Sequence, residues 1–202
     1  MIVIQKPELM DQLAGPKPYW RYHPRVKDHP GPSVVVGCLN WGSSQELKRI
    51  GKRVIGVDPQ TSNVPDGFEI IEGAVAPFRG TAELHGHDGG ASMFWFHRPV
   101  IATVKLITMD DVLKQTGEMA SLQMNCEGME ALTLITMRQP YADQMTIGFH
   151  DRPGGGPNGV GFGEPILQSA RDAIINHLAS WYDCVRLTAW TKDDWWFFLR
   201  RN

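Results

Sequence analysis

The sequence predicts an α/β domain with a mostly parallel β-sheet, and three observations support this class. Short runs of β-branched residues alternate with segments of helical periodicity, which is typical of parallel strands joined by right-handed crossovers. Residues 80–85 and 101–106 alternate with period two, so we expect an antiparallel insertion there. A short polar turn separates residues 184–189 from 195–199 and predicts a terminal antiparallel hairpin.

The individual elements follow from local signals. The strands expected in the parallel sheet are residues 33–36, 52–57, 68–71, 121–126 and 144–149. The expected helices are residues 43–50, 109–116, 127–137 and 166–180. We expect Ser43 or Ser44 to cap the first helix and Thr108 or Asp110 to begin the second.

The N-terminal segment differs from the rest of the chain. Six prolines fall within the first 32 residues, so a continuous helix is not expected there. We therefore divide the chain into a Pro-rich arm, residues 1–32, and a single domain, residues 33–202. Tyr19, Trp20 and Tyr22 lie in this arm. They either pack the arm onto the domain or form a lid over a ligand.

Composition and charge make several classes of protein unexpected. The 202 residues are 42% hydrophobic and 21% charged, which is typical of a packed globular domain. The net charge of -2 and the lack of a Lys/Arg run make a nucleic-acid partner unexpected. Three widely spaced cysteines suggest neither a disulfide framework nor a zinc knuckle. With no visible signal segment and no long apolar run, we expect a cytoplasmic protein that does not enter the membrane.

A ligand is expected at the carboxyl ends of the parallel strands. A glycine-containing turn, Gly37 to Gly42, joins the first strand to the first helix and can bring backbone N–H groups close to a ligand. Asp58 ends the second strand and can accept hydrogen bonds from ribose hydroxyls. The pyrophosphate fingerprint Gly-x-Gly-x-x-Gly is missing, which favours S-adenosylmethionine over a dinucleotide. Alternatively, Asp58 caps a helix that begins at Pro59.

Several segments, in order, resemble one family. These are residues 72–75 with 80–84, the Gly-Gly-Ala-Ser run at 89–92, the Thr-x-Asp-Asp-x-Leu run at 108–113, and the Glu-Gly-x-Glu signature within 121–130. Together they resemble the FkbM-type methyltransferases. The resemblance implies a Rossmann-like class I methyltransferase fold with S-adenosylmethionine as cofactor. It also implies a hydroxyl acceptor on a small molecule or glycan.

The resemblance also implies roles for individual residues. The residues that would contact the cofactor are Gly37, Asn40, Gly42, Asp58 and Ala74, with Ala74 against the adenine. The residues that would lie at the methyl-transfer end are Asn125, Glu127 and His150.

The acceptor hydroxyl must lose a proton, so a general base is expected. His150 is the first candidate, because an ordinary imidazole titrates at about pH 6.5. Glu127 is the second, at a predicted helix start that keeps a carboxylate ionised. Either residue can instead have a structural role, with His150 bound to backbone and Glu127 capping N–H groups. Asn125 can orient a hydroxyl but cannot take its proton.

Some charged positions of the family are lost here. The first strand ends in Val35 and Val36 where the family has an acid, and its Lys and Asp in the signature are Gln123 and Asn125. Leu39 lengthens the glycine turn by one residue. Two alternatives to a small-molecule methyltransferase therefore stay open. One is a binding or scaffold protein that has lost turnover, and the other is an RNA or protein methyltransferase.

Two further segments have alternative interpretations. His85 and His87, followed by Asp88, could bring two imidazoles to one face of a strand. No third ligand has fixed spacing, so we expect a polar loop and no metal. Residues 151–163 are rich in Gly and Pro. This loop either closes over an acceptor or connects two elements at the surface.

Overall fold

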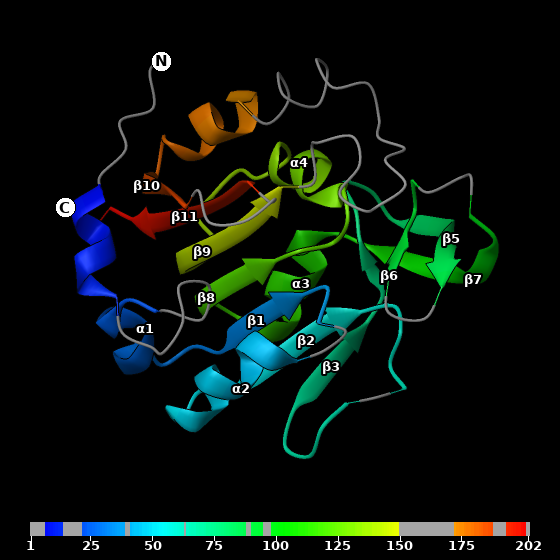
Figure 1. Cartoon of the computed structure of the whole chain (residues 1–202), viewed down its shortest axis with the longest axis horizontal. Helices are drawn as coiled ribbons and strands as arrows, with labels where there is room; N and C mark the ends of the chain where they lie inside the picture. The colour runs from blue at the N-terminus through cyan, green and yellow to red at the C-terminus, as the bar shows by residue number, and fades with distance from the viewer. Residues whose placement is uncertain are drawn as a thin grey trace.

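The computed structural model describes residues 7–13, 22–38, 41–62, 64–87, 90–94, 98–149, 172–187 and 193–200. Its main sheet has seven strands in the order β10-β11-β9-β8-β1-β2-β3 (Figure 1). The strands are β1 (Ser33–Val36), β2 (Val54–Asp58), β3 (Glu69–Glu72), β8 (Met119–Met124), β9 (Ala142–Phe149), β10 (Tyr182–Leu187) and β11 (Asp193–Leu199). All neighbouring pairs are parallel except those that β11 makes with β9 and β10.

This topology confirms the predicted fold class. The chain runs from β1 outward to β3, returns to β8 on the other side of β1, and inserts its last strand antiparallel between β9 and β10. A mostly parallel sheet with this strand order is the Rossmann-like methyltransferase fold. The terminal hairpin is also confirmed, with β11 inside the sheet and β10 at its edge.

The central strands are apolar because both faces of the sheet are covered. Every residue of β1 and β2 is buried. Val34 and Val36 pack on one face with residues of α3 (Met109–Thr116), α4 (Met129–Leu134) and the helix at 172–178. Val35, on the opposite face, packs with Trp41 and Leu47 at α2 (Gly42–Arg49).

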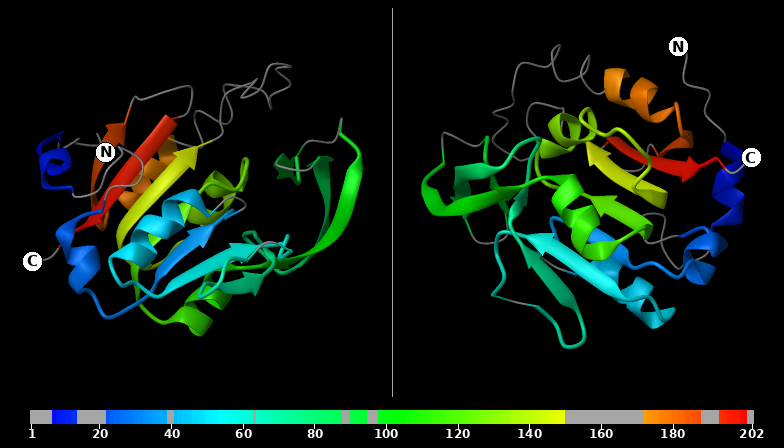
Figure 2. Two further views of the ribbon diagram at one scale, coloured as in Figure 1. Left: turned by 60° about the horizontal axis from the view of Figure 1, so that its bottom comes forward. Right: turned by 180° about the vertical axis from the view of Figure 1, so that it is seen from behind.

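The middle of the chain forms the expected insertion, a second sheet with strand order β4-β7-β5-β6. Its strands are β4 (Ala74–Val75), β5 (Gly80–His87), β6 (Gly90–Ser92) and β7 (Val100–Ile107). β5 pairs antiparallel with both β6 and β7, as the period-two pattern predicted. Figure 2 shows this sheet standing beside the end of the main sheet.

Three expectations about local structure are wrong. His87 belongs to β5 and not to a loop, because β5 and β6 pair as far as His87 and Gly90, whereas His85 lies in β5 as the pattern of residues 80–85 predicted. The cap of α2 is Trp41, since the helix begins at Gly42 and encloses Ser43 and Ser44 in its first turn. Residues 127–137 are not one helix, because Glu127 and Gly128 have φ of 53° and 111° and α4 begins only at Met129.

The second helix begins as predicted. Thr108 accepts a hydrogen bond from the Asp111 N–H, and the Asp111 side chain accepts one from the Thr108 N–H, which is a complete capping box at the start of α3. Arg79, in the turn between β4 and β5, donates two hydrogen bonds to the Asp111 carboxylate. The insertion is therefore tied to the helix that follows it.

Part of the N-terminal segment packs on the sheet. It contains the short helices η1 (Pro7–Gln12) and α1 (Pro24–Asp28). Tyr22 is buried with Val26 against Ala120 at the beginning of β8, in agreement with the packing alternative for that residue. Tyr19 and Trp20 lie outside the described residues, and the domain division at residue 32 stays a prediction. No helix in the described part of the chain has the length and apolar character needed to cross a bilayer.

Candidate functional site at the carboxyl edge of the main sheet

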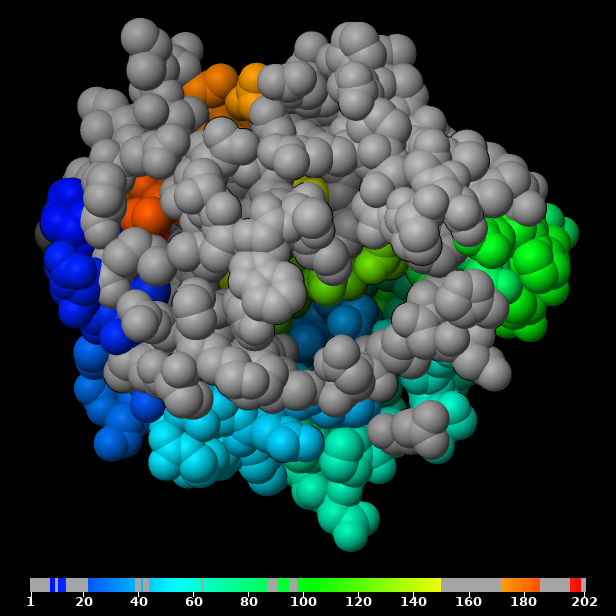
Figure 3. All heavy atoms as spheres, viewed as in Figure 1, coloured from blue at the N-terminus to red at the C-terminus, as the bar shows by residue number. Residues whose placement is uncertain are grey.

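The topological switch point of the main sheet lies between β1 and β8, which are adjacent but lead outward in opposite directions. In open α/β sheets, ligands bind beyond the carboxyl ends of the strands at such a point. Here those ends continue into Gly37 and Asn125. Figure 3 shows the surface hollowed on this side, with blue atoms of the β1 segment visible in the hollow.

Gly37 allows the two strand ends to approach closely. Its φ is +76°, and a Cβ at this position would lie 2.1 Å from the carbonyl oxygen of Asn125. The Asn125 N–H donates to the Val36 carbonyl at 3.1 Å, and the Gly37 N–H donates to the Val57 carbonyl at 3.0 Å. The glycine turn and the turn after β8 are therefore in direct backbone contact.

Asp58, the last residue of β2, binds the backbone of the turns that follow β1 and β2. It is only 6% exposed, and its two oxygens accept the N–H groups of Cys38 at 3.0 Å and Gln60 at 2.8 Å. Burial raises the pKa of this carboxyl, and the two backbone hydrogen bonds oppose the rise only partly. No helix begins at Pro59 in the described residues 59–62 and 64–68, so Asp58 braces two turns and is not a helix cap.

The residue before α2, Trp41, packs directly against β2. Trp41 has φ of +51° and packs its ring over Gly56, where a Cβ would lie 2.4 Å from the ring. The same ring makes an edge contact with Phe68 at 4.9 Å between centroids. Gly42 ends the glycine turn and is the first residue of α2, and its implied contact with the cofactor stays a prediction. Asn40 lies outside the described residues.

On the β8 side, Asn125 is the residue whose backbone contacts the glycine turn. Its side-chain oxygen Oδ1 is buried and accepts no hydrogen bond from the residues that the structure describes. A buried amide oxygen without a donor is costly, which makes this atom a candidate for contact with a bound ligand. Glu127, two residues later, is half-buried with φ of +53°, a conformation that non-glycine residues seldom adopt.

This turn is held by two residues of the quoted motifs to which the sequence assigned no role. Glu130 is 1% exposed, and its carboxylate accepts the N–H groups of Cys126 at 2.7 Å and Gly128 at 3.0 Å. Ser92, from β6, donates its hydroxyl to the Glu127 carbonyl at 2.7 Å. The capping role considered for Glu127 therefore belongs, for these two N–H groups, to Glu130. Glu130 had a sequence signal, as an acid in the first turn of α4, whereas the contact of Ser92 depends on the fold.

Ala74 lies close to this edge. The Gly73 N–H donates to the Asp58 carbonyl at 3.2 Å, which joins the beginning of β4 to the end of β2. Ala74 itself is buried in an apolar cluster with Ala76 and Met129. The contact with an adenine ring implied for Ala74 stays a prediction.

The thiols at this edge are neutral. Burial, with Asp58 as a second cause, raises the pKa of Cys38 to about 12. Burial also raises the pKa of Cys126 well above the ordinary thiol value. Neither sulfur is thus a thiolate nucleophile at neutral pH.

Other predicted positions fall outside the described residues. These are His150, the side chain of His87, Asp88 and the loop at 151–163. His85 is described, and its ring nitrogen Nδ1 lies 3.0 Å from the Arg98 carbonyl oxygen, so it binds backbone within the insertion.

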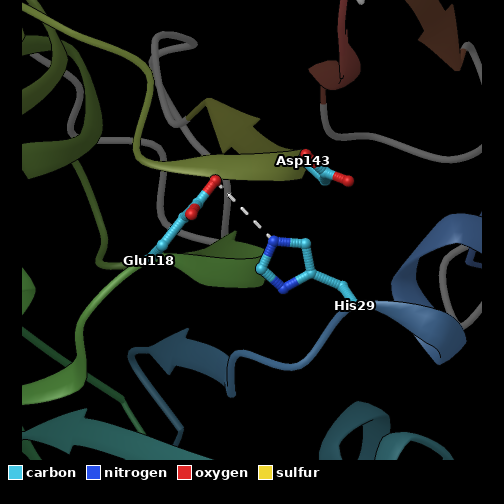
Figure 4. A group of neighbouring side chains, drawn as sticks. All are labelled: His29, Glu118 and Asp143. Atoms are coloured by element: carbon cyan, nitrogen blue, oxygen red, sulfur yellow. Dashed lines mark ion pairs between the residues drawn. The ribbon is translucent and has the colours of Figure 1, made fainter.

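A different polar cluster lies at the amino edge of the sheet. The ligand atoms of His29, Glu118 and Asp143 lie within 4.8 Å of one another (Figure 4). His29 Nδ1 accepts the Gly31 N–H at 2.9 Å, so in the neutral ring the proton is on Nε2, which faces Glu118 at 3.8 Å. A metal would need a lone pair on that nitrogen. The cluster is therefore better suited to a hydrogen bond than to a metal ion.

Comparisons with known proteins add little to this geometry. No family model matches the sequence, and no curated protein matches it. A crystal structure of a protein assigned as a ribosomal RNA methyltransferase from Plasmodium falciparum matches with a TM-score of 0.46 and 13% identity, over 87% of this chain and 90% of that one. A likeness of this extent says nothing about the substrate of the present chain.

Proposed function

We propose that the protein is an S-adenosylmethionine-dependent methyltransferase that methylates a hydroxyl group of a small molecule or glycan. The observation that carries this proposal is the buried Oδ1 of Asn125, which has no donor among the described residues and lies at the switch point beside the Gly37 turn. The short motifs that resemble FkbM-type enzymes support the same assignment.

The residues present fit the cofactor. A Cβ at position 37 would lie 2.1 Å from the Asn125 carbonyl oxygen, so glycine is needed for the two strand ends to meet beneath the proposed cofactor position. Each Asp58 oxygen already accepts one N–H but has a second lone pair, so ribose hydroxyls can still donate to it. Asn40, Gly42 and Ala74 would complete the binding surface.

The bound cofactor supplies a methyl group on a sulfonium sulfur, and the chain holds and deprotonates the acceptor. Asn125 Oδ1 would accept a hydrogen bond from the acceptor hydroxyl and fix its oxygen in line with the methyl group. As the oxygen–methyl bond forms and the sulfur–methyl bond breaks, leaving a neutral thioether, the hydroxyl proton passes to a base. His150 or Glu127 would take that proton, since an amide cannot.

A second candidate is a binding protein that keeps the fold without turnover. The lost charged positions favour it, since Gln123 and Asn125 stand where the family it resembles has Lys and Asp. An RNA acceptor is a third possibility, and the net charge of -2 disfavours it.

Calorimetric titration with S-adenosylhomocysteine tests the proposal, with NAD⁺ as the control ligand. We expect binding of the first compound and none of the second. Failure to bind S-adenosylhomocysteine at millimolar concentration would remove the proposed function, and binding without product from any hydroxyl acceptor would favour the binding protein.

The variant Asp58→Ala should weaken S-adenosylhomocysteine binding at least about tenfold, or about 1.4 kcal/mol. The matched control is Asp111→Ala, which also removes a carboxylate that accepts a backbone N–H but at the start of α3. Thermal unfolding of both variants checks that the titrations use folded protein. An unchanged dissociation constant for Asp58→Ala would exclude Asp58 from the site.

A further inference from the structure

The turn of residues 125–128 is held in a conformation that its own backbone does not favour. Glu127 has φ of +53° and Gly128 has φ of +111°. A non-glycine residue with such a φ, here Glu127, persists only where surrounding contacts hold it, and such residues concentrate at functional sites. The question is which side chains hold this turn, since it carries Asn125 and Glu127.

Glu130 holds the turn from inside the domain. Its buried carboxylate binds the N–H groups of Cys126 and Gly128, one on either side of Glu127. These N–H groups precede α4 and have no carbonyl partner in a helix, so a charge-assisted acceptor is effective there. The carboxylate thereby bridges the residue that has the strained φ.

Ser92 holds the turn from the insertion. Ser92 is 2% exposed, and its hydroxyl donates to the Glu127 carbonyl at 2.7 Å and accepts the Phe94 N–H at 3.1 Å. The Phe94 ring covers Gly128, where a Cβ would lie 3.2 Å from the ring. The last residue of β6 is therefore bonded directly to the turn after β8.

We propose that Ser92 and Glu130 are positioning residues, which fix the turn of residues 125–128 from its two sides and couple the antiparallel insertion to the methyl-transfer end of the site. This inference rests on the proposed function. Displacement of the turn would reach the glycine turn as well, because the Asn125 carbonyl abuts Gly37 and the Asn125 N–H binds Val36. Cofactor affinity therefore reports on the turn without knowledge of the acceptor.

The test compares two buried serines that each donate one hydroxyl hydrogen bond. Ser92→Ala removes the bond to the turn, and Ser121→Ala removes the bond from β8 to Ser33 at the opposite edge of the sheet. Ser92→Thr retains a hydroxyl. S-adenosylhomocysteine affinity is measured by calorimetry on the full chain, with thermal unfolding alongside.

We expect Ser92→Ala to weaken binding about fivefold, the effect of one buried hydrogen bond. Ser92→Thr should bind within about twofold of wild type, and Ser121→Ala should leave affinity unchanged despite a similar loss of thermal stability. Glu130→Gln should also weaken binding, because its amide NH₂ would face one of the two N–H groups.

If wild type binds S-adenosylhomocysteine and Ser92→Ala binds equally well, the positioning role is wrong and the proposed function stands. If Ser121→Ala loses affinity as much as Ser92→Ala, the effect is one of stability and the positioning role is again wrong. If wild type itself does not bind, the proposed function fails and this inference fails with it. Should Glu130→Gln not fold, the serine series decides alone.

Discussion

The two edges of the main sheet are both polar, but their polar groups are bound in different ways. At the amino edge, Ser121 donates to Ser33, and the ammonium of Lys52 donates to the His29 carbonyl. At the carboxyl edge, buried carboxylates bind the backbone of turns, and Asn125 Oδ1 accepts nothing from the described residues. The bonds cited at the amino edge join residues near the strand starts to one another, whereas those at the carboxyl edge hold turns in place and leave the Asn125 amide oxygen as an acceptor.

Backbone conformation shows the same difference. Among the described residues, the two non-glycine residues with positive φ are Trp41 and Glu127, and both lie at the carboxyl edge. Conformations of this kind cost of order 1–3 kcal/mol and are maintained by the surrounding packing. The edge where we propose that ligands bind therefore contains two backbone conformations that lower the stability of the fold.

The largest expected effect comes from paired glycine substitutions at the two edges. Gly37→Ala would bring a Cβ to 2.1 Å from a backbone oxygen, whereas Gly117→Ala, before β8, has a similar φ but no atom within 4 Å. In urea denaturation we expect Gly37→Ala to cost about 3 kcal/mol or more and Gly117→Ala only about 1–2 kcal/mol. Equal losses would mean that the strand ends are not in close contact.

A smaller effect is expected from two polar residues in and after β8. Ser121→Ala removes a satisfied hydroxyl and should lower the free energy of unfolding by about 1 kcal/mol. Asn125→Ala removes a buried oxygen that has no partner in the described part, so we expect a loss below about 0.5 kcal/mol, or a gain. Urea denaturation measures both. A loss above 1 kcal/mol for Asn125→Ala would show that its amide has a structural role.

The smallest effects are pH-dependent and opposite in sign. Arg79, together with the Thr108 N–H, lowers the pKa of Asp111, which therefore stabilises the fold above about pH 4 and loses this contribution as the pH falls. Burial raises the pKa of Asp58, so its ionised form costs stability, and this cost is relieved as the pH falls through the raised value. In urea titrations from pH 7 downward, the destabilisation by Asp111→Asn should shrink and that by Asp58→Asn should grow. If the effects of both variants changed with pH in the same direction, the opposite pKa shifts of Asp111 and Asp58 would be wrong.

Most of the fold could be predicted from periodicity, because the central strands are rich in β-branched apolar residues and the insertion alternates. The helix starts were predicted less well. The capping box at Thr108 is local and could be recognised in sequence. The start of α2 depends instead on Trp41, whose ring packs on Gly56 from a neighbouring strand, and a tertiary contact of this kind has no local signal.

The candidate site could be predicted in position but not in detail. Gly37, Asp58 and Asn125 were expected at the carboxyl edge because parallel strands end together, and they lie there. That Asp58 braces two turns, and that Ser92 reaches the Glu127 carbonyl, depends on which segments meet in space. Asp58 and Cys38 are 20 residues apart in the sequence, and Ser92 and Glu127 are 35 apart, so local spacing could not predict these contacts.

The position of β11 has a consequence for synthesis on the ribosome. Among the described strands of the main sheet, β10 pairs only with β11, which is translated after it. A nascent chain that ends before residue 193 therefore exposes the unpaired edge of β9 and cannot dock β10. The sheet closes in one late step, and until that step the growing polypeptide presents a strand edge open to aggregation or to chaperones.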